Sequence, residues 1–184
     1  MSEVPQMSSS PLRLVVMGVS GCGKSTMAEE LAGRLGLRMV DGDDLHFPES
    51  VAKMRAGIAL EDTDRWPWLD RIGGHLAECA ASSKGCVVAC SALRRKYRDR
   101  IRERAGDVCF LFLDGDFDLI QSRMRQRVGH YMQPGLLDSQ FRTLEKPQPD
   151  ETDIIILSIA EPVAALVEEA LTALHLHLGQ HSAT

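Results

Sequence analysis

Short apolar runs alternate along the chain with longer stretches of helical spacing. The apolar runs are bounded by polar or glycine residues and cover residues 12–17, 86–90, 108–113 and 154–157. Strands buried on both faces of a parallel sheet have this pattern. Helical spacing occurs in a segment that ends at Gly36 and again in residues 66–83, 94–105, 118–128 and 162–178. The alternation predicts βαβ units and a three-layer α/β fold with a parallel sheet.

The length of the chain favours a single domain. It has 184 residues, and its Ser-rich start, residues 1–10, predicts a disordered tail. We expect one domain over residues 11–178 and a C-terminal tail over 179–184. Residues 38–40 predict one more short strand, which runs into the acidic segment 41–44. Residues 129–139 contain Gly and Pro with little periodicity and predict a mobile loop.

Charge and cysteine content narrow the class of protein. The formal net charge is −5, which disfavours a nucleic-acid partner. No apolar run approaches the roughly 20 residues that cross a bilayer, so we expect no membrane segment. The five cysteines form no C-x-x-C pair. This odd count excludes a full disulfide framework and a standard zinc ribbon, and it favours a reduced, cytoplasmic protein.

The segment after the first predicted strand matches the phosphate-binding motif G-x-x-x-x-G-K-[ST] at every fixed position. Backbone N–H groups of such a loop point at phosphate oxygens, and the following helix adds positive potential. The predicted nucleotide-binding residues are Gly18, Val19, Ser20, Gly21, Cys22, Gly23, Lys24, Ser25 and Thr26. Lys24 would reach the β- and γ-phosphates of ATP, and the Ser25 hydroxyl would hold Mg²⁺.

The rest of the sequence narrows the class of P-loop protein. A GTPase needs an N/T-K-x-D tetrapeptide, which does not occur here. The length suits a small kinase that moves the γ-phosphoryl group to a small acceptor. Cys22 stands at a predicted helix N-terminus, where a thiol has a lowered pKa and oxidises easily, although an inert cysteine is the alternative.

Asp41 and Asp43 follow the second predicted strand, at the edge where open α/β sheets bind ligands. One carboxylate there could hold the Mg²⁺ shell and the other could orient an acceptor hydroxyl. We predict that Asp43 orients the hydroxyl or acts as base, and that Asp41 is a metal-water ligand. The alternative is an acidic turn in solvent.

Polar clusters further along the chain could complete an acceptor site. Ser91 and Arg94 directly follow a buried strand, so they should lie at the same edge of the sheet, where a guanidinium could bind an anionic acceptor. Asp64 is a plausible helix N-cap, with Pro67 in the first turn and two tryptophans packed into the core. The basic run 94–104 could instead face a nucleic acid, but two acids interrupt it and it carries few aromatic residues.

Two arginines precede the predicted mobile loop. Arg123 and Arg127 are four residues apart near the end of a predicted helix, so they share a face. They suit a lid, about residues 123–139, that closes on the transferring phosphoryl group. A surface pair of arginines is the alternative. The C-terminal histidines His175, His177 and His181 have no acidic companion, and we interpret them as a feature of the tail.

Several segments together resemble one family, the P-loop gluconokinases. The matching segments are the P-loop with Met17, Asp41-Gly-Asp43 with His46, Lys53-Met54, Asp64-Arg65, Pro67-Trp68-Leu69, Cys90-Ser-Ala-Leu93, Lys96-x-Tyr-Arg-Asp99, Gly115-Asp-Phe-Asp118, Arg127-x-Gly-His130, Gln140-Phe141, Leu144-Glu145 and Glu151-Thr-Asp153. The resemblance spans residues 12–170. The P-loop is widely shared, whereas Cys-Ser-Ala-Leu and Arg-x-Gly-His are much more specific.

The resemblance implies a nucleoside-monophosphate-kinase-like fold, Mg-ATP, D-gluconate as acceptor and often a homodimer. On this basis the acceptor-binding residues are Asp43, His46, Lys53, Arg65, Ser91, Arg94 and His130, and the catalytic residues are Lys24, Asp43, Arg123 and Arg127. Adenine is expected near the lid and residues 147–153. Alternatives are a kinase of another small acid such as shikimate, a nucleotide-binding regulator without an acceptor, and an RNA-binding P-loop protein.

Overall fold

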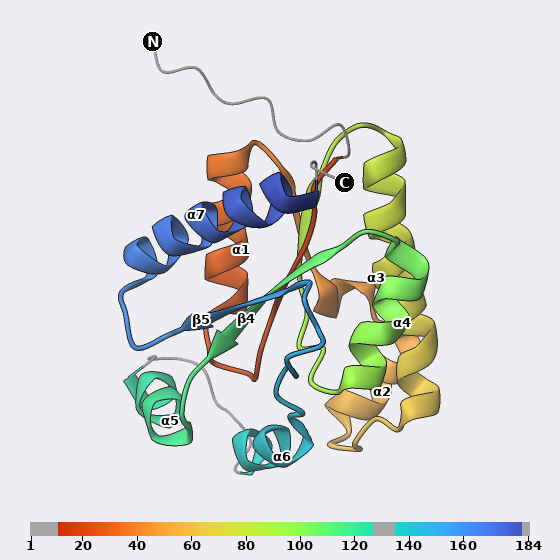
Figure 1. Ribbon diagram of the computed structural model, residues 1–184. Coiled ribbons are helices and arrows are strands. Elements are labelled where there is room, and N and C mark those ends of the chain that lie inside the picture. The colour runs from red at the N-terminus through yellow and green to blue at the C-terminus, as the bar shows by residue number, and fades with distance from the viewer. Residues whose placement is uncertain (1–10, 127–134, 182–184) are drawn as a thin grey trace.

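A parallel sheet of five strands forms the centre of the molecule. The computed structural model describes residues 11–126 and 135–181 (Figure 1). The strands are β1 (Arg13–Met17), β2 (Arg38–Asp41), β3 (Cys86–Ala89), β4 (Cys109–Asp114) and β5 (Ile154–Ser158). Their order is β2-β3-β1-β4-β5, and every neighbouring pair is parallel. The predicted parallel sheet is therefore confirmed, strand by strand.

Helices cover both faces of this sheet and so make the predicted three layers. They are α1 (Lys24–Leu35), α2 (Pro48–Arg55), α3 (Asp62–Ala81), α4 (Arg95–Ala105), α5 (Phe117–Gln126), α6 (Leu136–Thr143) and α7 (Val163–His181), with a short 3₁₀ helix η1 (Gly42–Leu45). In Figure 1, α1 and α7 lie on one face and α3 and α4 on the other. The helices α2, α5 and α6 gather beyond the carboxyl ends of the strands.

The core consists of two apolar layers because alternate residues of each strand face opposite sides. On β1, Leu14 and Val16 pack with α1 and α7, whereas Val15 and Met17 pack with α3 and α4. All four side chains are buried. A continuous apolar run in the sequence is what such a doubly covered strand requires.

The start of α3 differs from the sequence prediction. The helix begins at Asp62 instead of Trp66, and its N-cap is Glu61 instead of Asp64. Glu61 and Asp64 form a reciprocal capping box, in which each side chain accepts from the other residue's backbone N–H. Pro67 consequently lies inside the helix. The prediction of Asp64 as N-cap was wrong because a pair of acids three residues apart offers two possible caps.

Short helices were missed where the sequence has little periodicity. The helices η1, α2 and α6 fall in segments without a clear apolar repeat. The first half of α6, residues 136–139, lies inside the predicted loop 129–139. At the other end of the chain, α7 continues to His181, past the predicted boundary at 178. The tail 1–10 and the central part of the predicted lid, residues 127–134, lie outside the described residues.

None of the helices that the structure describes has both the length and the apolar character that crossing a membrane requires.

Candidate active site

The P-loop connects β1 to α1 and packs against α5. Gly23 is the N-cap of α1 in a left-handed conformation, with φ at 98°. Gly21 has a φ of 80°, which favours glycine, and a Cβ there would lie 2.5 Å from the Met124 sulfur and force that side chain to move. The Lys24 ammonium donates to the Val19 carbonyl oxygen at 3.0 Å and so lies over the loop. Such a glycine-rich loop at a helix N-terminus is suited to bind phosphate through its backbone N–H groups.

Cys22 does not fit the expectation of a reactive thiol. Its side chain is buried beneath the loop. Burial raises its pKa, and the nearby charge of Lys24 only partly opposes this. The structure therefore favours an inert cysteine at this position.

The turn after β2 brings Asp41 and Asp43 to the same edge of the sheet. Gly42 lies so close to β3 that a Cβ would sit 2.6 Å from the Ala89 carbonyl oxygen. The buried Trp68 indole donates to the Gly42 carbonyl at 2.7 Å. A tryptophan that the sequence assigned to core packing thus also anchors the acidic turn, which no sequence pattern indicated.

Asp41 links the turn to the P-loop. One of its carboxylate oxygens accepts from the Ser25 hydroxyl at 3.1 Å, and the other accepts from the Asp43 backbone N–H at 3.0 Å. The two residues predicted as metal ligands therefore lie within hydrogen-bond distance of each other. A hydroxyl and a carboxylate are the oxygen donors that Mg²⁺ prefers, directly or through water, so this pair fits that ion.

Asp43 has a raised pKa. Its side chain is exposed at the mouth of the site, but the protein around it reduces its hydration, and this is the main cause of the shift. The negative charges of Asp41 and Asp44 add to the effect, whereas Lys24 and His46 oppose it. A carboxylate with raised basicity is suited to accept a hydroxyl proton or hydrogen bond.

His46 lies beside Asp43 and stacks on Trp68, with ring centroids 4.2 Å apart. Burial lowers its pKa, Asp43 opposes the shift and Arg65 adds to it, so the ring is neutral near pH 7. Its buried Nδ1 has no hydrogen-bond partner among the described residues. A neutral imidazole with an unused nitrogen can bind the hydroxyl groups of a polyol.

Arg65 and Lys53 come to this region from α3 and α2. Arg65 donates to the Leu60 carbonyl at 3.1 Å, and its buried Nε has no partner among the described residues. Lys53 forms an ion pair with Asp64 at 2.7 Å. The charge of Lys53 is thus engaged within the protein, whereas Arg65 keeps an unused donor.

Ser91 and Arg94 follow β3 as predicted. The Ser91 carbonyl accepts from the Gly18 N–H at 3.3 Å, which joins this segment to the P-loop. Arg94 is the N-cap of α4 and lies 3.8 Å from Asp62 in a loose ion pair. Its guanidinium is half-buried and lies above the Tyr97 ring at 5.9 Å. Arg94 is therefore held in place without a close bidentate partner.

The predicted lid is described only at its two ends. Arg123 on α5 donates to the Ile159 carbonyl at 2.6 Å, and Gln140 on α6 accepts from the Ser20 N–H of the P-loop at 2.5 Å. Arg127 and His130 lie outside the described residues. Gln140 was quoted as part of a family motif, but its contact with the P-loop only became visible in the fold.

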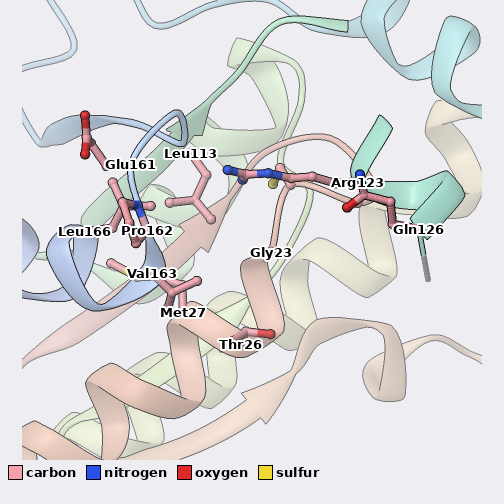
Figure 2. A pocket seen from close by; sticks show the side chains of 12 residues that line it. Gly23, Thr26, Met27, Leu113, Arg123, Gln126, Glu161, Pro162, Val163 and Leu166 are labelled. Atoms are coloured by element: carbon pink, nitrogen blue, oxygen red, sulfur yellow. The ribbon is translucent and has the colours of Figure 1, made fainter. Parts of the chain in front are cut away.

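A pocket of about 390 Å³ opens beside the P-loop (Figure 2). Its walls come from the P-loop and α1, from α5 and from the connection between β5 and α7: Gly21, Cys22, Gly23, Thr26, Met27, Leu113, Arg123, Gln126, Glu161, Pro162, Val163 and Leu166. Figure 2 shows the Arg123 side chain extended across it.

The late segment 147–153 lines no part of this pocket. Its acids pair with α4 instead: Asp150 with Arg95, Glu151 with Arg98, and Asp153 with Arg102. The pocket next to α5 and the β5–α7 connection is therefore a second place for adenine, on the lid side, and the expectation around 147–153 stays a prediction.

The strand order and the P-loop beside an acidic turn define a small P-loop kinase of the nucleoside-monophosphate-kinase-like type. In agreement, a family model described as an AAA domain matches residues 14–147. The thermosensitive gluconokinase of Escherichia coli (strain K12) is 41% identical over 159 residues, which are 86% of this chain and 85% of that protein. The gluconokinase of Gluconobacter oxydans (strain 621H) is 42% identical over 163 residues, which are 89% and 92% of the two chains.

A solved structure of a gluconokinase from Sinorhizobium meliloti 1021 superposes with a TM-score of 0.79 at 45% identity, and covers 92% of this chain and 93% of that one. The chain belongs to the gluconokinase family. A shikimate kinase from Aquifex aeolicus superposes with a TM-score of 0.52 at 16% identity, a likeness that extends to the fold alone.

Proposed function

We propose that this protein transfers the γ-phosphoryl group of ATP to the terminal hydroxyl of D-gluconate, which gives 6-phospho-D-gluconate and ADP. The observation that carries the proposal is the contact between the P-loop and the acidic turn, where Ser25 donates to Asp41 at 3.1 Å. It places a phosphate-binding loop next to Asp43, a carboxylate of raised pKa. The identity of about 40% to gluconokinases over most of the chain supports gluconate as the acceptor.

The phosphate side of the reaction involves Lys24, Ser25 and Asp41. Backbone N–H groups of the P-loop and of the first turn of α1 bind the phosphates, apart from those, such as the N–H groups of Gly18 and Ser20, that donate within the protein. Lys24 leaves the Val19 carbonyl to contact the β- and γ-phosphates. Ser25 and Asp41 would hold Mg²⁺, which neutralises charge on the phosphates when bound. Because phosphoryl transfer needs little covalent chemistry from the protein, these residues act by positioning and charge neutralisation.

The pocket beside the P-loop is our candidate for the adenine base. Apolar side chains of Pro162, Val163 and Leu166 line it, and the Arg123 guanidinium extends across it. A flat guanidinium stacks well on an aromatic base. Arg127, which lies outside the described residues, remains our candidate for a lid arginine that closes on the phosphoryl group.

The acceptor is bound on the other side of the P-loop. Asp43 accepts the hydrogen bond of the attacking hydroxyl. His46 and Arg65 bind further hydroxyl groups after side-chain rotations that expose the buried, unused His46 Nδ1 and Arg65 Nε. Arg94 binds the distal carboxylate, for which its guanidinium lacks a close bidentate partner within the chain. Ser91 lies at the same edge, and His130 and Lys53 complete the proposed set. Lys53 must exchange its ion pair with Asp64 in order to contribute.

The assembly and location of the protein also belong to this proposal. The homodimer rests on the resemblance to the family, and the cytoplasmic location is supported by five cysteines that form no disulfide. Sedimentation of the purified chain at several concentrations tests the dimer.

Release of ADP from Mg-ATP tests the reaction, with D-gluconate compared against shikimate, glucose, glucuronate and no acceptor. We expect strong stimulation by gluconate alone. Stimulation by another acid instead would keep the kinase and replace its substrate. If ATP binds but no acceptor stimulates ADP release, the proposed reaction is wrong and a nucleotide-binding regulator becomes the better interpretation.

A further inference from the structure

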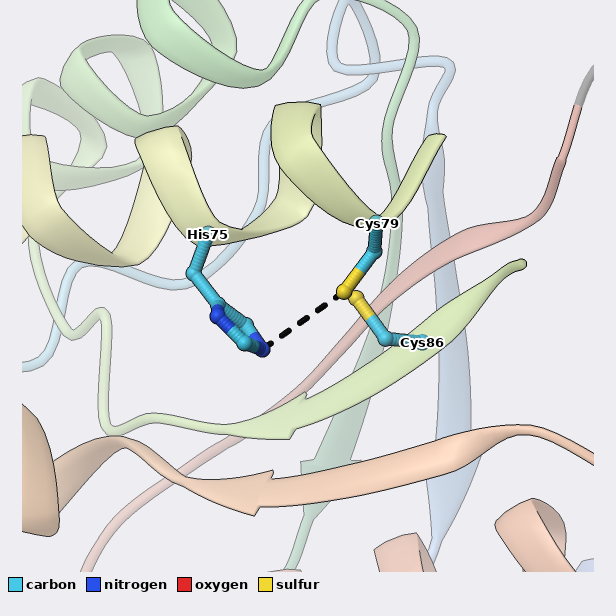
Figure 3. Close-up of side chains that lie close together, drawn as sticks. All are labelled: His75, Cys79 and Cys86. Carbon is cyan, nitrogen blue, oxygen red and sulfur yellow. Dashed lines mark hydrogen bonds between the residues drawn. The ribbon is translucent and has the colours of Figure 1, made fainter. Parts of the chain in front are cut away.

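Three side chains with metal-binding atoms meet between α3 and β3 (Figure 3). His75 and Cys79 are one turn apart on α3, and Cys86 is the first residue of β3. The imidazole Nε2 and the Cys79 sulfur are 3.6 Å apart. All three candidate ligand atoms lie within 4.8 Å of one another. The fold thus gathers a histidine and two cysteines that the sequence separates by four and seven positions.

This cluster is distinct from the candidate active site. Cys86 is in register with Arg13 and Arg38, the first residues of β1 and β2, so it stands at the amino edge of the sheet. The P-loop and the acidic turn stand at the carboxyl edge, because they follow the last residues of β1 and β2. No step of the proposed reaction uses any member of the cluster.

We propose that His75, Cys79 and Cys86 bind a thiophilic divalent cation such as Zn²⁺. Tetrahedral zinc bonds of about 2.3 Å to sulfur and about 2.0 Å to nitrogen bring ligand atoms to within roughly 3.5–3.8 Å of one another. The observed spacing reaches this range with small side-chain rotations. Three protein ligands leave the fourth position to water.

The charge balance of the buried site selects a divalent ion. Both cysteines are buried and His75 is half-buried. On binding, each thiol loses its proton to solvent as its sulfur bonds to the metal, and the neutral imidazole supplies a lone pair. Two thiolates and one divalent cation sum to zero, whereas a monovalent ion would leave a net negative charge in the core.

The surroundings of Cys86 agree with this chemistry. Burial and the contact with Cys79 raise its pKa, while the cationic side chains of Arg38 and Arg13 oppose the shift. Metal binding must therefore displace the proton of the Cys86 thiol. The two arginines favour the Cys86 thiolate that the ion requires, and His75 is the partly exposed member of the cluster.

Binding of Co²⁺ to the reduced, metal-free full-length chain tests the proposal, in the absence of nucleotide. We expect one Co²⁺ per chain with a thiolate-to-metal charge-transfer absorption, which sites made of histidine or carboxylate alone lack. Zn²⁺ should abolish the absorption by displacement. With free Zn²⁺ roughly 100-fold above its dissociation constant, the melting temperature should rise by about 5–10 °C.

Variants separate this site from other thiols. The double variant Cys79→Ser/Cys86→Ser should lose the absorption and the thermal shift. Cys109→Ser is the matched control, because Cys109 is also a buried first residue of a strand but packs on the opposite face of the sheet. It should keep both signals. His75→Gln changes a half-buried side chain and should weaken Co²⁺ binding roughly tenfold while the protein stays folded.

Two results would overturn the proposal. One is absence of the charge-transfer absorption from the reduced wild-type chain, including the case in which Cys79 and Cys86 only form a disulfide under mild oxidation. The other is unchanged Co²⁺ affinity in His75→Gln together with absorption that persists in the double variant. If the double variant fails to fold, the wild-type titration and His75→Gln decide the question.

Discussion

Two regions of this molecule use their charged side chains in different ways. Around the P-loop and η1, Asp43 has a raised pKa, His46 a lowered one, and Lys24 contacts only a backbone carbonyl among the described residues. Between α4 and the segment 145–153, by contrast, arginines and acids form close ion pairs. The first region leaves charges available to ligands, and the second uses them within the fold.

The second region centres on a fully buried pair. Arg98 donates two hydrogen bonds to Glu151, at 2.8 and 2.7 Å, and further ones to backbone carbonyls. Burial alone would raise the pKa of Glu151, but hydrogen bonds from Arg98, the Gln148 N–H and Arg102 outweigh it and lower the pKa to about 2. The basic run that the sequence left open as a nucleic-acid face therefore supplies a structural clamp.

The largest expected effect is on catalysis, in the first region. Asp43→Asn should reduce turnover by roughly 10²–10⁴-fold, because the amide cannot accept the hydroxyl proton. Binding of Mg-ATP should change little. The free energy of unfolding should not fall, because the raised pKa shows that the folded state disfavours the charged carboxylate. Steady-state kinetics, nucleotide titration and urea denaturation measure the three quantities. Near-normal turnover would remove Asp43 from its role.

In the clamp, mutation should reduce the free energy of unfolding. Arg98→Ala leaves a buried, unpaired carboxylate and should lower the free energy of unfolding by about 3–5 kcal/mol. Arg104→Ala is the control, because its partner Asp70 also pairs with Arg100 and the pair is partly exposed. The control should cost no more than about 1 kcal/mol in urea denaturation. Equal losses in the two variants would contradict a buried clamp.

Substrate affinity distinguishes two adjacent arginines that belong to different regions. Arg94→Ala should raise the gluconate KM roughly 10–100-fold through loss of charged hydrogen bonds, with the KM for ATP nearly unchanged. Arg95→Ala should leave both values unchanged, because Arg95 pairs with Asp150 on the protein surface. An unchanged gluconate KM in Arg94→Ala would move the carboxylate site elsewhere.

The smallest effect concerns the pH dependence of the reaction. The rate should fall as the pH falls through the raised pKa of Asp43, because the protonated carboxyl cannot accept the hydroxyl proton. Asp44 is the smallest of the charges that raise this pKa, so Asp44→Asn should move the acid limb of kcat/KM slightly to lower pH. The exposed acid Asp107 precedes the amino end of β4, and Asp107→Asn should leave the limb in place. A limb at the same pH in both variants would assign it to another group.

The sequence was informative where one local pattern implies one structure. Continuous apolar runs predicted four of the five strands, the short segment 38–40 predicted β2, and the P-loop motif predicted the phosphate site. The predicted start of α3 was wrong because Glu61 and Asp64 cap the helix together. Which of the two acids is the N-cap depends on the path of the preceding chain. The helices η1, α2 and α6 are short, so each has too few apolar positions for a periodic pattern to predict it.

The sequence by itself determined the α/β class, the P-loop with its Lys24 and Ser25, and the pair of acids that ends β2, because each depends on neighbours within a few positions. Only the tertiary structure decided which polar groups meet. It placed Trp68 under the acidic turn, paired Arg98 with Glu151, and brought Cys86 to His75 and Cys79. The physical reason is that hydrogen bonding and charge pairing act over a few ångströms in space, whereas the residues concerned lie up to 53 positions apart.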